Sequence, residues 1–514
     1  MKKNKIPLYE QILNSPPLLG FLGFLFMAIL NFSCLNNPPY WDDILGLHNQ
    51  AIWLAKNNFN IIELWKPEHG DANVYKFGII PYFYGILYSL FSPQTVHVIG
   101  HLFNISCLAL VFGLSYSILC KFGVLSWWAL LWCIAAMCEP VMAGRVTALG
   151  QECTVLCATI LCIYFLADKK YWLGFLFIVI AVLCKTTAIN LAAAFILWLF
   201  ADICLSGNEW RQRLKKYCPF FIGAILLIGL SMFERFGVHD GLLSGKIIPG
   251  QWLDSLDFHF RYLMPVQFAA LLIMVFVTVV KAIAVIKNKT LFKLPDKDKI
   301  SLLILIMTGG FWVSYSIYNC PLPRYTAFIV FPMYIFIALN TFSQKKYLTS
   351  ILAVFLMLIG ILNTNGSFYL KLPNRFRRSG EYLERSREYL NDLWENQKAC
   401  KLLETRYFNR PVVAKWPFLQ MLTMPEMGYV SQALPNVYTA CPPISYAKIK
   451  IYDPKVKMPD NTIYVFGFNS LEAWTKFGPS LMPDLKKRYK IILKNQIRDG
   501  WLVLYEKEPE RSAK

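Results

Sequence analysis

The sequence is short of charged residues. Only 16% of its 514 residues are charged and 56% are hydrophobic, whereas a typical soluble domain has about 25% charged residues. Most of the 14 cysteines lie in apolar segments without metal-site spacing, and no pattern supports a disulfide between Cys400 and Cys441. Repeats, low-complexity tracts and a small-residue cleavage site after the first apolar run are also missing. These absences argue against a wholly soluble protein, a cysteine metal site and a cleaved signal peptide.

Long apolar runs are abundant and indicate a polytopic α-helical membrane protein. A run of about 17–25 apolar residues is long enough to cross a bilayer. Two further stretches, 44–56 and 79–91, are too short or too interrupted to span and are expected to lie on the outer leaflet as interfacial helices. The eleven predicted spans are 17–35, 95–119, 123–139, 150–167, 171–185, 186–205, 217–236, 261–286, 300–318, 325–342 and 347–363.

The net charge of +20 predicts an orientation and does not imply nucleic-acid binding. Basic residues collect in short cytoplasmic loops of membrane proteins. With a cytoplasmic N-terminus, the clusters at 169–170, 211–216, 281–299 and 345–346 all fall on that side. If residues 77–92 formed a span instead, every later cluster would lie outside.

The last 151 residues are expected to form a separate soluble domain. An odd number of spans places residues 364–514 outside and residues 1–363 in the membrane domain. Helical periodicity over 378–404 and strand patterns at 412–414 and 462–466 predict a small α/β fold. The segments 491–493 and 501–505, joined through Asp499-Gly500, predict a hairpin.

Two adjacent carboxylates, Asp42 and Asp43, follow the first span. Charge this close to hydrocarbon is costly and usually functional, although either residue could instead cap a helix over 44–56. The same predicted face carries Lys76, Arg145, Glu152, Lys185 and Arg324-Tyr325. Cations can hold a lipid phosphate while a carboxylate acts as general base.

Each of these residues has a structural alternative. Lys76 and Arg324 could extend toward lipid headgroups, and Arg145 could form a structural pair with Glu152. The charge of Lys185, in a tight turn between two apolar runs, is harder to explain structurally. His48 and His69 are too isolated to suggest a metal and are expected to be surface histidines.

The order of these segments resembles the GT-C superfamily of membrane glycosyltransferases, in the branch of the protein O-mannosyltransferases and aminoarabinose transferases. Trp41-Asp42-Asp43 resembles the acidic pair of that group, which is usually Asp-Glu. The other similar segments are Lys76 to Tyr84, Gly144 to Glu152, Leu183 to Thr187, Pro323-Arg324-Tyr325 with Phe331-Pro332, Val412 to Phe418 and Pro425 to Val430.

The resemblance implies an inverting glycosyltransferase that uses a polyprenyl-phosphate sugar. Asp42 would be the general base and Asp43 its support. It implies donor-phosphate binding by Lys76, Arg145 and Arg324, with Glu152, Lys185 and Tyr325 as supporting residues. No metal or other cofactor is expected, although a divalent metal is not excluded. The implied location is the bacterial inner membrane, with residues 364–514 periplasmic and a lipid, glycan or protein as acceptor.

Two other functions use the same features. A transporter or flippase of a lipid-linked or anionic solute would share the buried charges, but transporters often show inverted repeats, and the sequence has none. A non-catalytic sensor whose tail binds a partner would not need the charges beside the membrane. Deleting residues 364–514 would then abolish function, whereas Asp42→Asn would not.

Overall fold

The computed structural model describes most of the helical part and the strands of the tail. The predicted site residues Asp42 and Lys76 lie outside the described residues, as does Cys441. The described ranges are 15–40, 43–60, 78–237, 265–287, 294–317, 323–341, 346–364, 387, 389–414, 417–439, 450–451, 458–459, 461–466, 489–497 and 500–507.

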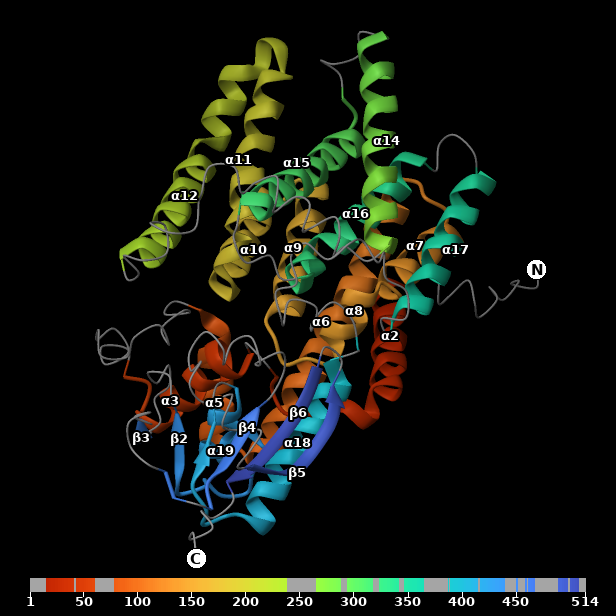
Figure 1. Ribbon diagram of the computed structural model, residues 1–514. Coiled ribbons are helices and arrows are strands. Elements are labelled where there is room, and N and C mark those ends of the chain that lie inside the picture. The colour runs from red at the N-terminus through yellow and green to blue at the C-terminus, as the bar shows by residue number, and fades with distance from the viewer. Residues whose placement is uncertain are drawn as a thin grey trace, which may run out of the picture.

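The chain folds as a helical bundle followed by a mixed β-sheet (Figure 1). The helices before the sheet are α2 (Pro16–Leu30), α3 (Asn49–Lys56), α5 (Ile79–Leu90), α6 (Pro93–Lys121), α7 (Ser126–Met137), α8 (Pro140–Val146), α9 (Glu152–Ala167), α10 (Tyr171–Cys184), α11 (Ile189–Cys204), α12 (Trp210–Gly237), α14 (Pro265–Lys287), α15 (Asp296–Ile317), α16 (Ala327–Thr341) and α17 (Lys346–Asn363). Short turns are η1 (Phe32–Cys34), the π-helix η2 (Asp43–His48), η4 (Thr186–Ala188), η5 (Gly207–Glu209) and η7 (Pro323–Thr326).

The bundle has the properties of an integral membrane protein. Five helices among the described residues are long and apolar enough to cross a membrane, or six if the bent pair α7–α8 is one span. α12 and α14 turn rows of large apolar side chains outward, including Ile225 and Leu230 on α12 and Phe276 and Ile283 on α14. Such a continuous apolar exterior indicates contact with lipid.

The sequence predicts eleven spans, which is more than the five or six described helices that are long and apolar enough to cross a membrane. Several predicted spans are shorter as helices: α9 has 16 residues and α10 has 14. At about 1.5 Å per residue, each is shorter than the roughly 30 Å hydrocarbon core. The predicted span 123–139 ends in a bend of 71° between α7 and α8. A hydropathy count does not show where a helix ends or bends, so several apolar runs are longer than the helices they contain.

α16 forms the centre of the bundle. It packs against α6, α7, α9, α14 and α15, and almost every one of its side chains is buried. A helix that is apolar all round is stable only when it is surrounded in this way. α16 therefore fixes the position of the turn η7 that precedes it.

The tail contains a six-stranded sheet with helices on one side. Its strands are β1 (Val412–Val413), β2 (Val437–Thr439), β3 (Lys450–Ile451), β4 (Ile463–Phe466), β5 (Tyr489–Ile497) and β6 (Gly500–Lys507), in the order β3-β2-β1-β4-β6-β5. The first four in this order pair in parallel, and β6 and β5 are antiparallel. The β5–β6 pairing confirms the predicted hairpin. Cys400, in α18 (Tyr389–Arg406), is buried, and its thiol is free among the described residues.

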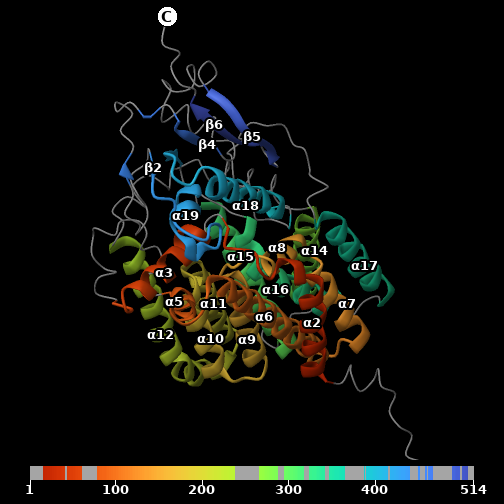
Figure 2. The ribbon, with the colours of Figure 1, turned by 90° about the horizontal axis from the view of Figure 1, so that it is seen from below.

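The tail shares a hydrophobic core with the first part of the chain. α18 (Tyr389–Arg406) and α19 (Phe418–Thr423) lie between the sheet and the bundle (Figure 2). Tyr40, Ile44 and Ile52 are buried in the same cluster as the inner side chains of these helices and strands. The segment after the first helix is therefore covered by residues some 350 positions later.

Candidate functional site

Glu152 is at the centre of a buried group of charges. It is the first residue of α9, and its side chain is 3% exposed. Its carboxylate lies 2.5 Å from Lys185 Nζ, 3.6 Å from Arg324 Nε and 3.7 Å from Arg145 Nη1. The pairing predicted as an alternative for Arg145 and Glu152 is therefore present, within a larger cluster.

A bent helix pair, the end of a helix and a short 3₁₀ turn place the three cations around this carboxylate. Arg145 lies in the last turn of α8, beyond the 71° bend. Lys185 has an extended backbone between α10 and η4, and Arg324 lies in η7 just before α16. Irregular backbone at membrane depth is tolerated where it is buried in protein or lines a cavity. These three irregular segments thus meet at the Glu152 carboxylate.

Asp43 completes the cluster from the first loop. Its Oδ1 lies 3.8 Å from Arg324 Nη1, and its side chain is 9% exposed. Burial raises the pKa of Asp43 to about 6, although the nearby Arg324 guanidinium lowers it. Because Arg324 is buried against two carboxylates, the alternative that it reaches for lipid headgroups is wrong.

The aromatic ring of Tyr325 lies against the same cluster. Lys185 Nζ lies 4.4 Å from the centre of the Tyr325 ring, and the Arg324 guanidinium carbon lies 5.3 Å from it. A ring face attracts a cation at such a distance. The structure therefore brings together six of the eight predicted site residues: Asp43, Arg145, Glu152, Lys185, Arg324 and Tyr325.

Among the described residues, the cluster combines three cations, Arg145, Lys185 and Arg324, with two carboxylates, Glu152 and Asp43. Arginine and lysine side chains bind phosphate and carboxylate groups through charge-assisted hydrogen bonds. The cluster therefore has the residue types that bind an anion.

Gly150 is a site residue that sequence reasoning did not single out. A Cβ atom at this position would lie 2.4 Å from Glu152 Oε2 and 3.2 Å from Asp43 Oδ1. Contacts shorter than 3.0 Å require something to move. The motif Gly144 to Glu152 contains this glycine, but only the geometry shows why it has no side chain.

We expect Gly150→Ala to lower the free energy of unfolding by about 1–3 kcal/mol, as overpacking usually does. The added methyl group would push against a carboxylate that Lys185 and two arginines hold in place. Thermal unfolding of the purified protein in detergent measures the change. Gly309→Ala is the matched control, because nothing lies within 4 Å of its added methyl group. Equal unfolding midpoints for both variants would contradict the prediction.

His48 is fully buried, so the prediction of a surface histidine was wrong. Its Nδ1 lies 2.8 Å from the Tyr88 hydroxyl, and its Nε2 lies 3.3 Å from the Leu149 carbonyl oxygen. The sequence alone does not show this burial, because it depends on the packing of α5, which carries Tyr88, against the turn that carries His48. Burial lowers the pKa of His48 to about 3, so the neutral ring holds the backbone beside Gly150. Among the described residues, no group of three or more His, Cys, Asp or Glu could hold a metal.

The tail holds the segments on either side of the cluster. The Tyr389 hydroxyl donates to Thr147 Oγ1 at 2.9 Å, and its ring stacks on Tyr40 at 5.4 Å. The Tyr429 hydroxyl donates to the Pro39 carbonyl oxygen at 2.8 Å. The tail thus contacts the chain just before the acidic pair and just before Gly150.

Comparison with known proteins shows a likeness of fold. No known protein family matches the sequence, and no curated protein matches it. The fold is similar to that of ArnT from Cupriavidus metallidurans, whose crystal structure was determined with bound undecaprenyl phosphate. The TM-score is 0.52 at 14% identity, and the match covers 95% of this chain and 97% of that chain. This likeness confirms the predicted architecture, a helical membrane bundle with a small mixed sheet at the C-terminal end.

Proposed function

We propose that this chain is an inverting glycosyltransferase that moves a sugar from a polyprenyl-phosphate donor to an acceptor outside the cytoplasm. The observation that carries the proposal is the buried cluster of three cations around Glu152 with Asp43 beside it. Its cations suit a lipid-linked phosphate. The fold supports the same function, because a protein of this architecture binds undecaprenyl phosphate.

In this proposal the cations bind the donor and its leaving group. Arg145 and Arg324, together with Lys76, hold the phosphate through charge-assisted hydrogen bonds. Lys185 and Glu152 fix the arginine side chains, and Tyr325 covers the two cations at its ring. The negative charge that develops on the phosphate is stabilised by groups already in place.

The acidic pair acts on the acceptor. Asp42 takes the proton of the acceptor hydroxyl or amine, and Asp43 orients it from its position beside Arg324. The acceptor atom attacks the anomeric carbon from the side opposite the phosphate. The bond from that carbon to the phosphate oxygen breaks, and polyprenyl phosphate leaves.

The proposed topology has eleven spans, with residues 1–363 in the membrane and residues 364–514 outside. The N-terminus is cytoplasmic and the acidic pair lies at the outer surface. The contact between the tail and the loop that carries the acidic pair supports a shared compartment for both. The tail covers the site and helps to select the acceptor.

The test uses the purified full-length protein in liposomes with a radiolabelled polyprenyl-phospho-sugar. A glycosyltransferase releases the label from the lipid and attaches it to an added acceptor. A flippase moves the intact labelled lipid between leaflets and forms no product. Transport without any sugar transfer, over a panel of lipid, glycan and peptide acceptors, would overturn the proposal.

The pKa of Asp43, raised to about 6, predicts the pH dependence of this activity. Below about pH 6 the carboxyl group is protonated and loses its attraction to Arg324, so we expect the transfer rate to fall as the pH falls. The stability contribution has the opposite sign: because the folded state holds this proton more tightly, the contribution is present at low pH and is lost as the pH rises through about 6. Transfer rates from pH 4.5 to 8 measure the first effect. An acidic limb that is the same in Asp43→Asn would show that another group causes it.

A further inference from the structure

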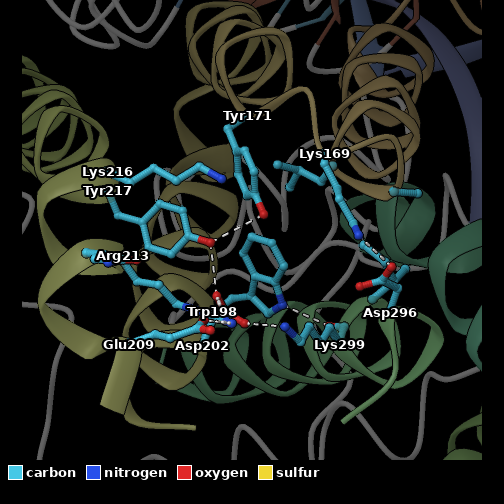
Figure 3. Close-up of a pocket in the computed structure, with 14 residues that line it drawn as sticks. Lys169, Tyr171, Trp198, Asp202, Glu209, Arg213, Lys216, Tyr217, Asp296 and Lys299 are labelled. Carbon is cyan, nitrogen blue, oxygen red and sulfur yellow. Dashed lines mark hydrogen bonds and ion pairs between the residues drawn. The ribbon is translucent and has the colours of Figure 1, made fainter. Parts of the chain in front are cut away.

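A polar cavity lies at the opposite ends of the helices that carry the site. It has a volume of about 320 Å³ and is lined by residues of α9, α10, α11, α12 and α15, with Glu209 from η5 (Figure 3). Glu152 begins α9, whereas Leu166 near its end lines the cavity, which is about 21 Å further along the helix axis at 1.5 Å per residue. The cavity is therefore separate from the cluster around Glu152.

Every carboxylate of this cavity already has a cationic partner. Asp202 lies 2.7 Å from Arg213, 2.8 Å from Lys299 and 2.9 Å from the Tyr217 hydroxyl. Glu209 pairs with the same arginine at 3.1 Å. Asp296 pairs with Lys169 at 2.9 Å. A bound cation would have to compete with these pairs.

One cation of the cavity has no carboxylate partner among the described residues. The Lys216 ammonium lies 4.3 Å from the centre of the Tyr171 ring and 5.6 Å from that of Tyr217, along one wall of the cavity (Figure 3). The lining residues Lys169, Arg213, Lys216 and Lys299 against Asp202, Glu209 and Asp296 give a formal charge of 4 − 3 = +1.

The surroundings of the cavity place it at the depth of lipid headgroups. Trp172 on α10 is 64% exposed and follows the lining residue Tyr171. Trp210, the first residue of α12, is 45% exposed and follows the lining residue Glu209. Exposed tryptophans of membrane proteins collect at the boundary between lipid and water. A ligand with one negative charge and an apolar anchor fits both the charge and the position.

We propose that this cavity binds a singly charged phosphate group, with an anionic phospholipid as the favoured source. Lys216 contacts the phosphate, and Lys169 and Arg213 lie on either side of it (Figure 3). The site is on the face opposite the acidic pair, so in the proposed topology it recruits lipid from the cytoplasmic leaflet. A soluble phosphate ester is the other source of the same chemistry. The proposal is independent of glycosyl transfer.

The experiment measures lipid binding to the purified full-length protein by native mass spectrometry. The probes are phosphatidylglycerol, phosphatidylcholine and inorganic phosphate. We expect Lys216→Ala to weaken phosphatidylglycerol binding about fivefold, the effect of one basic residue near a membrane surface. Lys215→Ala is the matched control. It removes the same charge at the neighbouring position, but the Lys215 side chain does not line the cavity. Lys216→Arg keeps the charge and is expected to bind within twofold of the unmodified protein.

The outcomes separate the two sources and the failure of the proposal. Phosphatidylglycerol binding that depends on Lys216, with weak phosphatidylcholine binding, supports the lipid site. If inorganic phosphate alone binds in a Lys216-dependent way and neither lipid does, a soluble ligand takes its place at the same site. If Lys216→Ala and Lys215→Ala bind all three probes equally, the proposal is wrong. Lys216→Arg guards against a loss that arises from misfolding alone.

Discussion

Replacing Asp42 with asparagine is expected to slow sugar transfer at least about a hundredfold, the lower range for the loss of a general base. Asparagine has nearly the same shape but cannot take up the acceptor proton at neutral pH. The donor binds through the cations, so its KM is expected to change little. Initial rates with a polyprenyl-phospho-sugar and purified protein measure both parameters.

The neighbouring carboxylate provides the comparison. Asp43→Asn removes the carboxylate opposite Arg324. We expect a smaller loss of kcat and a donor KM that stays equal or falls, because the phosphate then meets one negative charge fewer. Asp168→Asn is the control, because Asp168 pairs with Lys121 at the far end of α9 and is expected to change neither parameter. If Asp42→Asn keeps turnover within a few-fold of the unmodified protein, Asp42 is not the base. If Asp43→Asn causes the larger loss of kcat and Asp42→Asn the smaller one, Asp43 is the base.

Glu152→Gln is expected to lower the free energy of unfolding by about 3–5 kcal/mol, as the removal of one partner from a buried ion pair does. The glutamine would leave Lys185, Arg145 and Arg324 buried without the carboxylate that lies within 3.7 Å of each. The fall in the thermal unfolding midpoint of the detergent-purified protein measures the loss. Glu209→Gln is the matched control, since its side chain is 65% exposed and such pairs contribute at most about 1 kcal/mol.

A phosphate ligand should partly reverse this loss. Polyprenyl phosphate would supply the negative charge that the variant lacks, so it is expected to raise the unfolding midpoint more in Glu152→Gln than in the unmodified protein. If the variant unfolds at the same temperature as Glu209→Gln, Glu152 does not neutralise the three cations. If the ligand stabilises both proteins equally, the cations and the phosphate do not interact directly.

The sequence was most informative where its signals are local or periodic. Apolar runs indicated the helices, and alternation around Asp499-Gly500 predicted the β5–β6 hairpin. Counting spans from the N-terminus also assigned Arg145, Lys185 and Arg324 to one face, and the structure places them around one carboxylate. Their roles in catalysis remain predictions, as do those of Asp42 and Lys76.

What the sequence could not predict depends on distances between elements. The close contact at Gly150 becomes visible only when Glu152 and Asp43 are placed beside it. The burial of His48 requires α5 to pack over it. β2 and β3 have three and two residues, too few for a periodic pattern. The bend of 71° between α7 and α8 also depends on how the two helices pack and could not be predicted from the apolar run over 123–139.

The hydrogen bond from Tyr429 to Pro39 joins residues 390 positions apart. At roughly 5–20 residues per second, a ribosome needs about 20–80 s to pass from one to the other. The first loop of a nascent chain is therefore synthesised long before Tyr429, which binds it, has been added to the chain. Premature release of the polypeptide would therefore leave the first loop without the hydrogen bond from Tyr429 that holds it.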